Sequence, residues 1–254
     1  MAEKMMKLDP HTHTSPASLC SHVSPEELVQ LYKKAGFDAV MLSNHCIPFY
    51  WDQFGSEHEA RVQGFLRDYE RTLRAGREAG LKVLFGAEVI VIHQVEEDGE
   101  EKTKYADFLL FGLTPEQLKK AEPELGTISQ RELYDFCNAN DILMFQAHPC
   151  RYEMNHCPMD PHLMHGVEIF NAHLNLDNRF DRVLQMQKEG DLLISAGSDF
   201  HEPDEAGRAG LLVDQAVETA QDLRDYLKTR RQRVLALPGL LKEGDLPSEF
   251  LAAK

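Results

Sequence analysis

Two histidines two positions apart, His11 and His13, are the first residues in the sequence that suggest chemistry. They follow a short apolar run. If residues 6–10 form a strand, side-chain alternation directs both imidazoles to the same side. Pro10 is tolerated at the end of a strand, which indicates that the pair lies where the strand passes into a loop. There the two imidazoles could hold one ion, although an isolated His-x-His pattern fits two exposed loop histidines equally well.

Histidines and carboxylates recur where other apolar runs end. The positions that follow expected strands are His45, Glu88, His148, Asp199 and His201, and His22 lies in the loop after the first strand. Burying so many ionisable groups together is costly unless they bind a cation. Because neutral imidazole and carboxylate are ligands for Zn, Mn and Fe, the pattern predicts a divalent metal site.

Apolar runs and helix signals alternate along the chain, which predicts a parallel sheet with helical crossovers. Helices are expected to begin at the serine caps Ser24 and Ser129. The helix from Ser24 is expected to end at Gly36, and two others at Gly80 and Gly190. The expected strands cover residues 6–10, 37–43, 81–85, 107–112, 142–147, 167–170 and 192–196. About seven such units favour a barrel whose strand ends meet at one face, and an open doubly wound sheet is the alternative.

Other segments are expected to support the fold or to lie in solvent. Residues 96–104, EEDGEEKTK, are expected to form a solvated loop, and residues 217–234 an amphipathic helix near the C-terminus. The aromatic run from Phe49 to Phe54 fits either a lid over a substrate or core beneath a loop. The histidines at positions 156, 162, 165 and 173 are expected to be solvated loop residues.

The composition narrows the classes of partner. With 42 acidic against 27 basic residues the formal net charge is −15, which disfavours binding to long nucleic acid. A small phosphorylated metabolite remains compatible, because bound cations would dominate the local field. Five cysteines without a CxxC pair indicate reduced thiols, and no apolar run reaches the length of a membrane span. We therefore expect a cytoplasmic protein that does not enter a membrane.

The ordered set of motifs resembles the PHP family, the polymerase and histidinol-phosphatase superfamily of metal-dependent phosphoesterases. The motifs that carry the resemblance, over about residues 5–205, are DPHTH at 9–13, SH at 21–22, SNH at 43–45, GAE at 86–88, HP at 148–149 and SDFH at 198–201. The resemblance implies an α/β fold, a distorted TIM-like barrel of seven βα units. It also implies two to three divalent metal ions, Zn, Mn or Fe, at the C-terminal face of the strands. We place this domain at residues 1–210 and treat 211–254 as a helical extension packed on it.

The resemblance divides the expected metal ligands into three groups. The first metal would be held by His11, His13, Glu88 and Asp199. Glu88 would bridge this metal to a second one, shared with His148. The third metal would be held by His22, His45 and His201.

The middle of the chain also looks like a bacterial subgroup of the family, through HPCR at 148–151 and EIFN at 168–171. Two departures from the family pattern bear on the metals. Asn44 stands where an aspartate usually precedes the histidine, and its lost charge could weaken the third metal. No extra ligand for the second metal is evident. His93 would face away from Glu88 on a regular strand, and Asp107 would start a strand at the wrong end, so neither is chosen.

The resemblance implies hydrolysis of a small phosphate ester by metal-bound hydroxide. Arg151 would clamp the phosphate with its planar guanidinium, and His201 or His22 would carry the leaving-group proton. One alternative is an amidohydrolase-type enzyme that cleaves C–N bonds or lactones, which is disfavoured because no lysine stands at an expected strand end. The other is a metal-stabilised scaffold without activity. The sequence leaves the substrate, the metal and the oligomeric state open.

Overall fold

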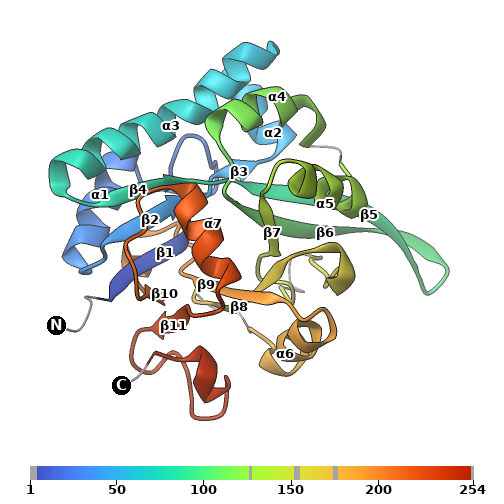
Figure 1. Cartoon of the computed structure of the whole chain (residues 1–254). Helices are drawn as coiled ribbons and strands as arrows, with labels where there is room; N and C mark the ends of the chain where they lie inside the picture. The colour runs from blue at the N-terminus through green and yellow to red at the C-terminus, as the bar shows by residue number, and fades with distance from the viewer. Residues whose placement is uncertain (1–4, 126–127, 152–154, 174–176, 253–254) are drawn as a thin grey trace.

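The computed structural model describes residues 5–125, 128–151, 155–173 and 177–252 (Figure 1). Its strands are β1 (Met6–Thr12), β2 (Ala39–Leu42), β3 (His45–Cys46), β4 (Lys82–Phe85), β5 (Glu88–Glu97), β6 (Glu100–Phe111), β7 (Leu143–Gln146), β8 (Gly166–Asn171), β9 (Leu193–Gly197), β10 (Ala209–Val213) and β11 (Arg233–Ala236). Its α-helices are α1 (Pro25–Lys34), α2 (Pro48–Trp51), α3 (His58–Ala79), α4 (Pro115–Leu125), α5 (Gln130–Ala139), α6 (Phe180–Glu189) and α7 (Ala220–Lys228). Single 3₁₀ turns are η1 (Asp52–Phe54), η3 (Pro161–Leu163), η4 (Pro203–Glu205) and η5 (Ser248–Phe250).

The strands form two sheets. One has the order β11-β10-β1-β2-β4 and the other the order β3-β5-β6-β7-β8-β9. A parallel bridge between Thr12 and Phe200 brings the end of β1 beside the end of β9, so the sheets approach each other there. The expected α/β class is confirmed. Among the described strands the ladders do not close, so the seven-unit barrel is not confirmed.

Both sheets mix parallel and antiparallel neighbours. β1, β2 and β4 run parallel, as do β7, β8 and β9. In contrast, β10 is antiparallel to β1 and β11, and β6 is antiparallel to β5 and β7. The expectation of parallel strands throughout is therefore wrong, although the parallel units do carry the expected helical crossovers.

β5 and β6 form a long hairpin that extends away from the body of the molecule (Figure 1). Its turn is made by Asp98 and Gly99, whose φ angles of 58° and 79° are both positive. Such a two-residue turn matches the twist of the flanking strands. Residues on both sides of the turn are paired, with Glu97 opposite Glu100. The solvated loop expected at residues 96–104 is therefore wrong.

The helix ends follow the expected signals. The hydroxyl of Ser24 accepts a hydrogen bond from the N–H of Glu27 at 3.3 Å, and Ser129 forms a capping box with Glu132. Gly80 ends α3 in the left-handed conformation, with φ of 70°. The C-terminal region differs, because the helix expected over residues 217–234 is limited to α7 and the strand β11 follows it. The boundary expected at residue 210 falls within β10, which pairs with β1.

The apolar core lies between the strands and the helices that cover them. Leu8 on β1, Phe65 on α3, Phe108 on β6 and Val167 on β8 are buried in its larger part. A smaller cluster, including Tyr32, packs α1 against β2. This packing fixes the strand ends from which the polar residues project. No described helix is long and apolar enough to cross a membrane.

Candidate metal centre

His11 and His13 project from the end of β1 into the interior, where both are fully buried. β1 extends to Thr12, and its register against β2 shifts around Pro10, which has no N–H to donate. Gly197, at the end of β9, allows β9 to approach this pair. A Cβ at that position would stand only 2.4 Å from the Cβ of His11.

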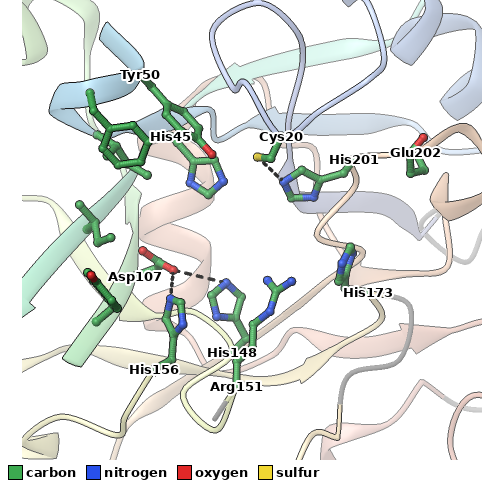
Figure 2. A pocket seen from close by; sticks show the side chains of 14 residues that line it. Cys20, His45, Tyr50, Asp107, His148, Arg151, His156, His173, His201 and Glu202 are labelled. Carbon is green, nitrogen blue, oxygen red and sulfur yellow. Dashed lines mark hydrogen bonds and ion pairs between the residues drawn. The ribbon is translucent and has the colours of Figure 1, made fainter. Parts of the chain in front are cut away.

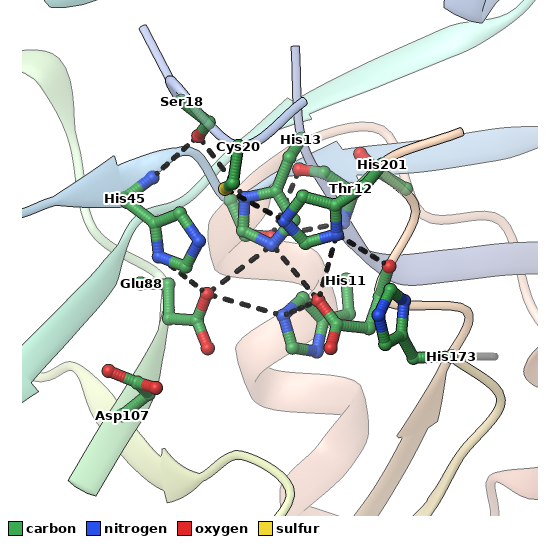
Figure 3. A network of polar contacts seen from close by, with 12 residues as sticks. His11, Thr12, His13, Ser18, Cys20, His45, Glu88, Asp107, His173 and His201 are labelled. Atoms are coloured by element: carbon green, nitrogen blue, oxygen red, sulfur yellow. Dashed lines mark hydrogen bonds and ion pairs between the residues drawn. The ribbon is translucent and has the colours of Figure 1, made fainter. Parts of the chain in front are cut away.

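The carboxylate of Glu88, the first residue of β5, lies among four imidazoles, of which Figure 3 shows those of His11, His13 and His45. Its oxygens are 3.4 Å from Nε2 of His11, 3.3 Å from Nε2 of His13, 3.0 Å from Nδ1 of His45 and 3.2 Å from Nε2 of His148. These residues come from β1, β3 and the turn after β7, so the structure brings together five of the residues predicted from the sequence.

Asp199 joins the same group from the turn after β9. Its Oδ1 atom is 3.2 Å from Nε2 of His11 and 3.4 Å from Nε2 of His13. Both Asp199 and His148 have positive φ angles, 51° and 25°. Residues other than glycine adopt such backbone conformations at a cost, and they concentrate at functional sites.

Hydrogen bonds from the far side of the rings fix which nitrogen faces the centre. Nδ1 of His11 donates to Oε1 of Glu168 at 2.9 Å, and Nδ1 of His201 donates to the carbonyl of Asp199 at 2.8 Å. Because Nδ1 carries the hydrogen in each case, Nε2 presents its lone pair. Histidines that ligate metals are held in this way by carboxylates and carbonyls.

Buried atoms at the centre lack hydrogen-bond partners among the described residues. They are Nε2 of His11 and His13, Nδ1 of His45, Oε2 of Glu88, and Oδ1 of Asp107 and Asp199. Leaving such groups unpaired costs about 1–3 kcal/mol each. Their separations resemble the spacing of about 3.4 Å expected for ligands roughly 2.1 Å from a shared tetrahedral ion. The described residues form several overlapping groups of three candidate ligands, so the donor set fits a multinuclear metal site.

The charges of the group also favour a cation. Burial opposes ionisation of Glu88 and Asp199, but neighbouring imidazoles, His11 foremost, outweigh burial and hold both pKa values well below their usual range. Burial likewise opposes charge on His11, yet the nearby carboxylates raise its pKa well above the usual value. In contrast, burial and adjacent imidazoles lower the pKa of His13. Divalent cations would replace protons here, so binding would release protons.

The β5–β6 hairpin adds Asp107, which was not chosen as a ligand because it was expected to start a strand at the wrong end. Asp107 lies inside β6 opposite Ile90 on β5, so it is not at the start of a strand. Directly opposed residues of an antiparallel pair share a face, and Ile90 shares its face with Glu88. Asp107 therefore points to the centre, with Oδ2 3.9 Å from Nε2 of His148.

His156 completes this part of the site. Its Nε2 atom is 2.5 Å from Oδ2 of Asp107, and its side chain is buried, so the expectation of a solvated loop histidine is wrong for His156. A bridge to Tyr105 on β6 holds it in place. His93 pairs with Lys104 on the opposite face of the hairpin, as its odd spacing from Glu88 predicted.

His22 does not join the other predicted ligands. Its side chain is 72% exposed and pairs with the carboxylate of Glu202. The loop places Cys20 there instead, with Sγ 3.1 Å from Nε2 of His201. Burial would raise the pKa of the Cys20 thiol, but contacts with His201 and His45 outweigh it and lower the pKa to about 6.

A cavity of about 390 Å³ opens onto the centre (Figure 2). Its polar wall contains His45, Asp107, His148, Arg151, His156, His173 and His201. Its apolar wall contains Ile47, Phe49, Tyr50, Ile90 and Tyr105. The aromatic residues after β3 therefore have different environments. Phe49 and Tyr50 line the cavity, whereas Trp51 is buried in the core.

Arg151 and His173 enter the cavity from different segments. Nη1 of Arg151 is 3.3 Å from Oδ2 of Asp199, which places the guanidinium beside the expected metals. Nδ1 of His173 is 2.8 Å from Oε1 of Glu205. His173 was expected to be a solvated loop residue, but only 22% of its side chain is exposed.

A model of the PHP domain matches residues 9–231. The chain belongs to the PHP family. A search of curated proteins found no match to this PHP protein.

Solved structures share its fold at low sequence identity. PsfC from Pseudomonas syringae PB-5123 is 13% identical with a TM-score of 0.64, and the match covers 93% of each chain. A candidate metal-dependent phosphoesterase from Bifidobacterium adolescentis is 16% identical with a TM-score of 0.53, over 89% of this chain and 96% of the other. An amidohydrolase from Chromobacterium violaceum, with bound sulfate and no metal, is 14% identical with a TM-score of 0.52, over 91% of this chain and 98% of the other.

Asn44 supports the PHP site through hydrogen bonds. Its Oδ1 atom accepts from the N–H of Thr14 at 2.7 Å and from the hydroxyl of Ser18 at 3.0 Å, and its Nδ2 donates to Oγ1 of Thr14 at 3.1 Å. The hydroxyl of Ser18 in turn lies 3.3 Å from Nδ1 of His13 and accepts from the N–H of His45 at 3.0 Å. Asn44 thus acts on two histidines by positioning Ser18.

Proposed function

We propose that this PHP protein is a metal-dependent phosphoesterase that acts on a small phosphorylated metabolite. The observation that carries the proposal is the group of buried imidazoles and carboxylates around Glu88, open on one side to the cavity. Divalent metals bound there would activate water and neutralise phosphoryl charge. Zn, Mn and Fe are all compatible with imidazole and carboxylate ligands.

The residues of the site would have two roles: most would hold the metals, and Arg151 would bind the substrate. The first metal would be held by His11, His13, Glu88 and Asp199, and the second by Glu88, His148, Asp107 and His156. His45 and His201 remain for a third. Arg151, with its guanidinium 3.3 Å from Asp199, is placed to bind phosphoryl oxygens in a planar two-point contact.

His173 is better positioned than His201 or His22 to transfer a proton to the leaving group. Nδ1 of His201 donates to the carbonyl of Asp199 and its Nε2 faces Cys20, so His201 is suited to ligation. His22 is exposed and pairs with Glu202. His173 lines the cavity, and its pairing with Glu205 would orient the ring toward the leaving group.

The apolar wall points to a substrate with a compact organic group beside the phosphate. Phe49, Tyr50 and Tyr105 offer aromatic faces opposite the polar wall. Burying apolar substrate surface against them would add binding energy away from the reacting phosphate. A substrate of this kind fits the cavity volume of about 390 Å³.

The test is phosphate release from a panel of mono- and diesters by protein reconstituted with Zn, Mn or Fe. Glu88→Gln removes the charge at the centre of four imidazoles, so turnover is expected to fall by at least about 100-fold, the order of magnitude of one strong transition-state contact. Glu96→Gln, on the exposed part of the hairpin, is the matched control and should keep full activity. Metal loading without phosphate release from any ester would overturn the proposal.

Amide and lactone hydrolysis is the second candidate, because one structural neighbour is named an amidohydrolase. Against it, no lysine lies among the described residues that line the cavity. The same reconstituted protein should therefore be assayed on amides and lactones. Activity on these in place of phosphate esters would reverse the choice. If Glu88→Gln changes only stability, and the wild type turns over nothing, the protein is a metal-stabilised scaffold.

A further inference from the structure

The loop between β1 and α1 is attached to the backbone of His201. The hydroxyl of Ser21 donates to the carbonyl of His201 at 3.3 Å, and the N–H of His22 donates to the same carbonyl at 3.1 Å. The N–H of Ser21 also donates to the carbonyl of Ser18 at 3.1 Å. Because the residues after Cys20 are held in this way, the Cys20 side chain is directed toward the His201 ring (Figure 2).

Cys20 faces the ring nitrogen of His201 that does not bond the carbonyl of Asp199. Its Sγ atom is 3.1 Å from Nε2 of His201, and the Nδ1–H of the same ring donates to the carbonyl of Asp199 at 2.8 Å. The cysteine also interacts with the imidazole of His45 on the other side. A sulfur and two imidazoles, from the loop after β1, from β3 and from the turn after β9, therefore meet beside the cavity (Figures 2 and 3).

The histidines point to a cation independently of the cysteine. Candidate ligand atoms of His13, His45 and His201 lie within 4.8 Å of one another. Nε2 of His13 is fully buried and makes no hydrogen bond among the described residues, and its nearest carboxylate oxygen, on Glu88, is 3.3 Å away. Nδ1 of His45 likewise makes none and is 3.0 Å from the same carboxylate. In contrast, His22, which the family resemblance assigns to the third metal, is 72% exposed and pairs with Glu202.

We propose that Cys20, in place of His22, is a thiolate ligand of the metal held by His45 and His201. The proposal rests on the metal centre proposed above. On binding, a sulfur–metal bond forms and the thiol proton passes to solvent. Cys20, His45 and His201 would then supply three protein ligands, the number that catalytic zinc sites commonly have.

Because of the thiolate, the metal site at Cys20 should prefer a different metal from the site at Glu88 and Asp199. Thiolate is a soft ligand that selects Zn over Mn, whereas carboxylates accept Mn readily. Reconstitution with a mixture of Zn and Mn should therefore fill the Cys20 position with Zn.

The test is cobalt titration of the metal-depleted full-length protein without oxygen, followed by absorption spectroscopy. Visible bands report cobalt bound to any ligand, and an intense near-ultraviolet band reports a thiolate–cobalt bond. The wild type is expected to show both. Cys20→Ser should lose the thiolate band and bind its last cobalt at least about 10-fold more weakly, the lower end of the cost of disturbing a metal site. The matched control, His22→Gln, should keep the band and the affinity.

The outcomes separate this proposal from the metal centre itself. The absence of visible cobalt bands in the wild type would rule out the proposed metal centre. Visible bands without a thiolate band would leave the centre in place and overturn the role of Cys20. Persistence of the thiolate band in Cys20→Ser would assign it to another cysteine, and loss of cobalt in His22→Gln alone would restore His22 as the ligand.

A second measurement needs no variant. Alkylation of Cys20, mapped by peptide mass spectrometry, should be at least about 10-fold slower in the Zn-loaded wild type than in the metal-depleted wild type, because a ligating sulfur is withheld from the reagent. Equal alkylation in both states would overturn the proposal.

Discussion

Glu168 orients two candidate ligands, His11 and His148, through hydrogen bonds. Its Oε1 atom accepts from Nδ1 of His11 at 2.9 Å, and its Oε2 accepts from the backbone N–H of His148 at 3.0 Å. Nδ2 of Asn171 donates to the same Oε2 at 2.8 Å. One fully buried carboxylate thus sets the tautomer of one histidine and the backbone position of another.

Replacing Glu168 with glutamine is expected to weaken metal binding by about 10–100-fold. The amide keeps one acceptor oxygen but presents an NH₂ group, which must face either the Nδ1–H of His11 or the N–H of His148. Isothermal titration of the metal-depleted protein with Zn measures the loss. Glu189→Gln, on the exposed side of α6, is the control and should bind as the wild type does. Unchanged affinity in Glu168→Gln would show that the ring orientation does not depend on this carboxylate.

Single residues were predictable where a strand fixes their direction and less so in loops. The strand ends placed His11, His13, Glu88, His148 and Asp199, and the structure brings all five together. Cys20 and His22 lie in one loop, where no periodicity states which side chain turns inward. Only the attachment of that loop to His201, 180 residues away in sequence, selects the cysteine.

At the scale of elements, the sequence contained a turn signal for the β5–β6 hairpin, but our prediction did not use it. Asp98-Gly99 is a strong signal for a two-residue hairpin turn, but the charged residues around it suggested a solvated loop. Once the turn is placed, the register follows and puts Asp107 opposite Ile90, on the face of Glu88. The contribution of His156 could not follow from local pattern, because it depends on a bridge to Tyr105 about fifty residues earlier.

α7 illustrates how a helix end contributes stability that depends on pH. Oδ2 of Asp222 accepts from the N–H groups of Thr219 at 2.9 Å and Glu218 at 3.1 Å, and Oγ1 of Thr219 accepts from the N–H of Asp222 at 3.1 Å. The hydrogen bond with the Thr219 side chain is the main cause that lowers the pKa of Asp222 below its usual value, and the N–H groups of Glu218 and Thr219 add to it. A carboxyl with a lowered pKa in the folded state stabilises the fold above its unfolded pKa of about 3.9, and this stabilisation is lost as the pH falls through the folded pKa.

Asp222→Ala is therefore expected to lower the free energy of unfolding by about 0.5–1 kcal/mol at pH 7, the usual contribution of an exposed cap. The difference from the wild type should shrink below about pH 4, as the carboxyl of the wild type becomes protonated. Urea unfolding curves between pH 7 and pH 3 measure this trend. Asp222→Asn keeps an acceptor oxygen and should lose less. A deficit that stays constant across this range would contradict the role of the charge.

At the scale of the whole molecule, the candidate site draws on both sheets. His11 and His13 come from β1 in one sheet, and His45 and Glu88 come from β3 and β5 in the other. The α/β class and most helices were predictable from periodicity and caps. The division into two sheets was not, because it depends on antiparallel pairings of β6 and β10 that join segments far apart in the chain.

Because ligands from both sheets converge on one charged cluster, metal binding should stabilise the entire fold. A ligand that binds only the native state at 100 times its Kd adds about 2.7 kcal/mol, which corresponds to a rise in Tm of about 5–10 °C for a chain of this size. Differential scanning calorimetry of the Zn-loaded and chelator-treated protein measures the shift. Glu88→Gln is the comparison, because it removes the carboxylate shared by four imidazoles and should show a smaller shift on Zn addition. An identical Tm with and without metal would mean that the cluster does not bind a cation, and its unpaired atoms would then need to be satisfied by water.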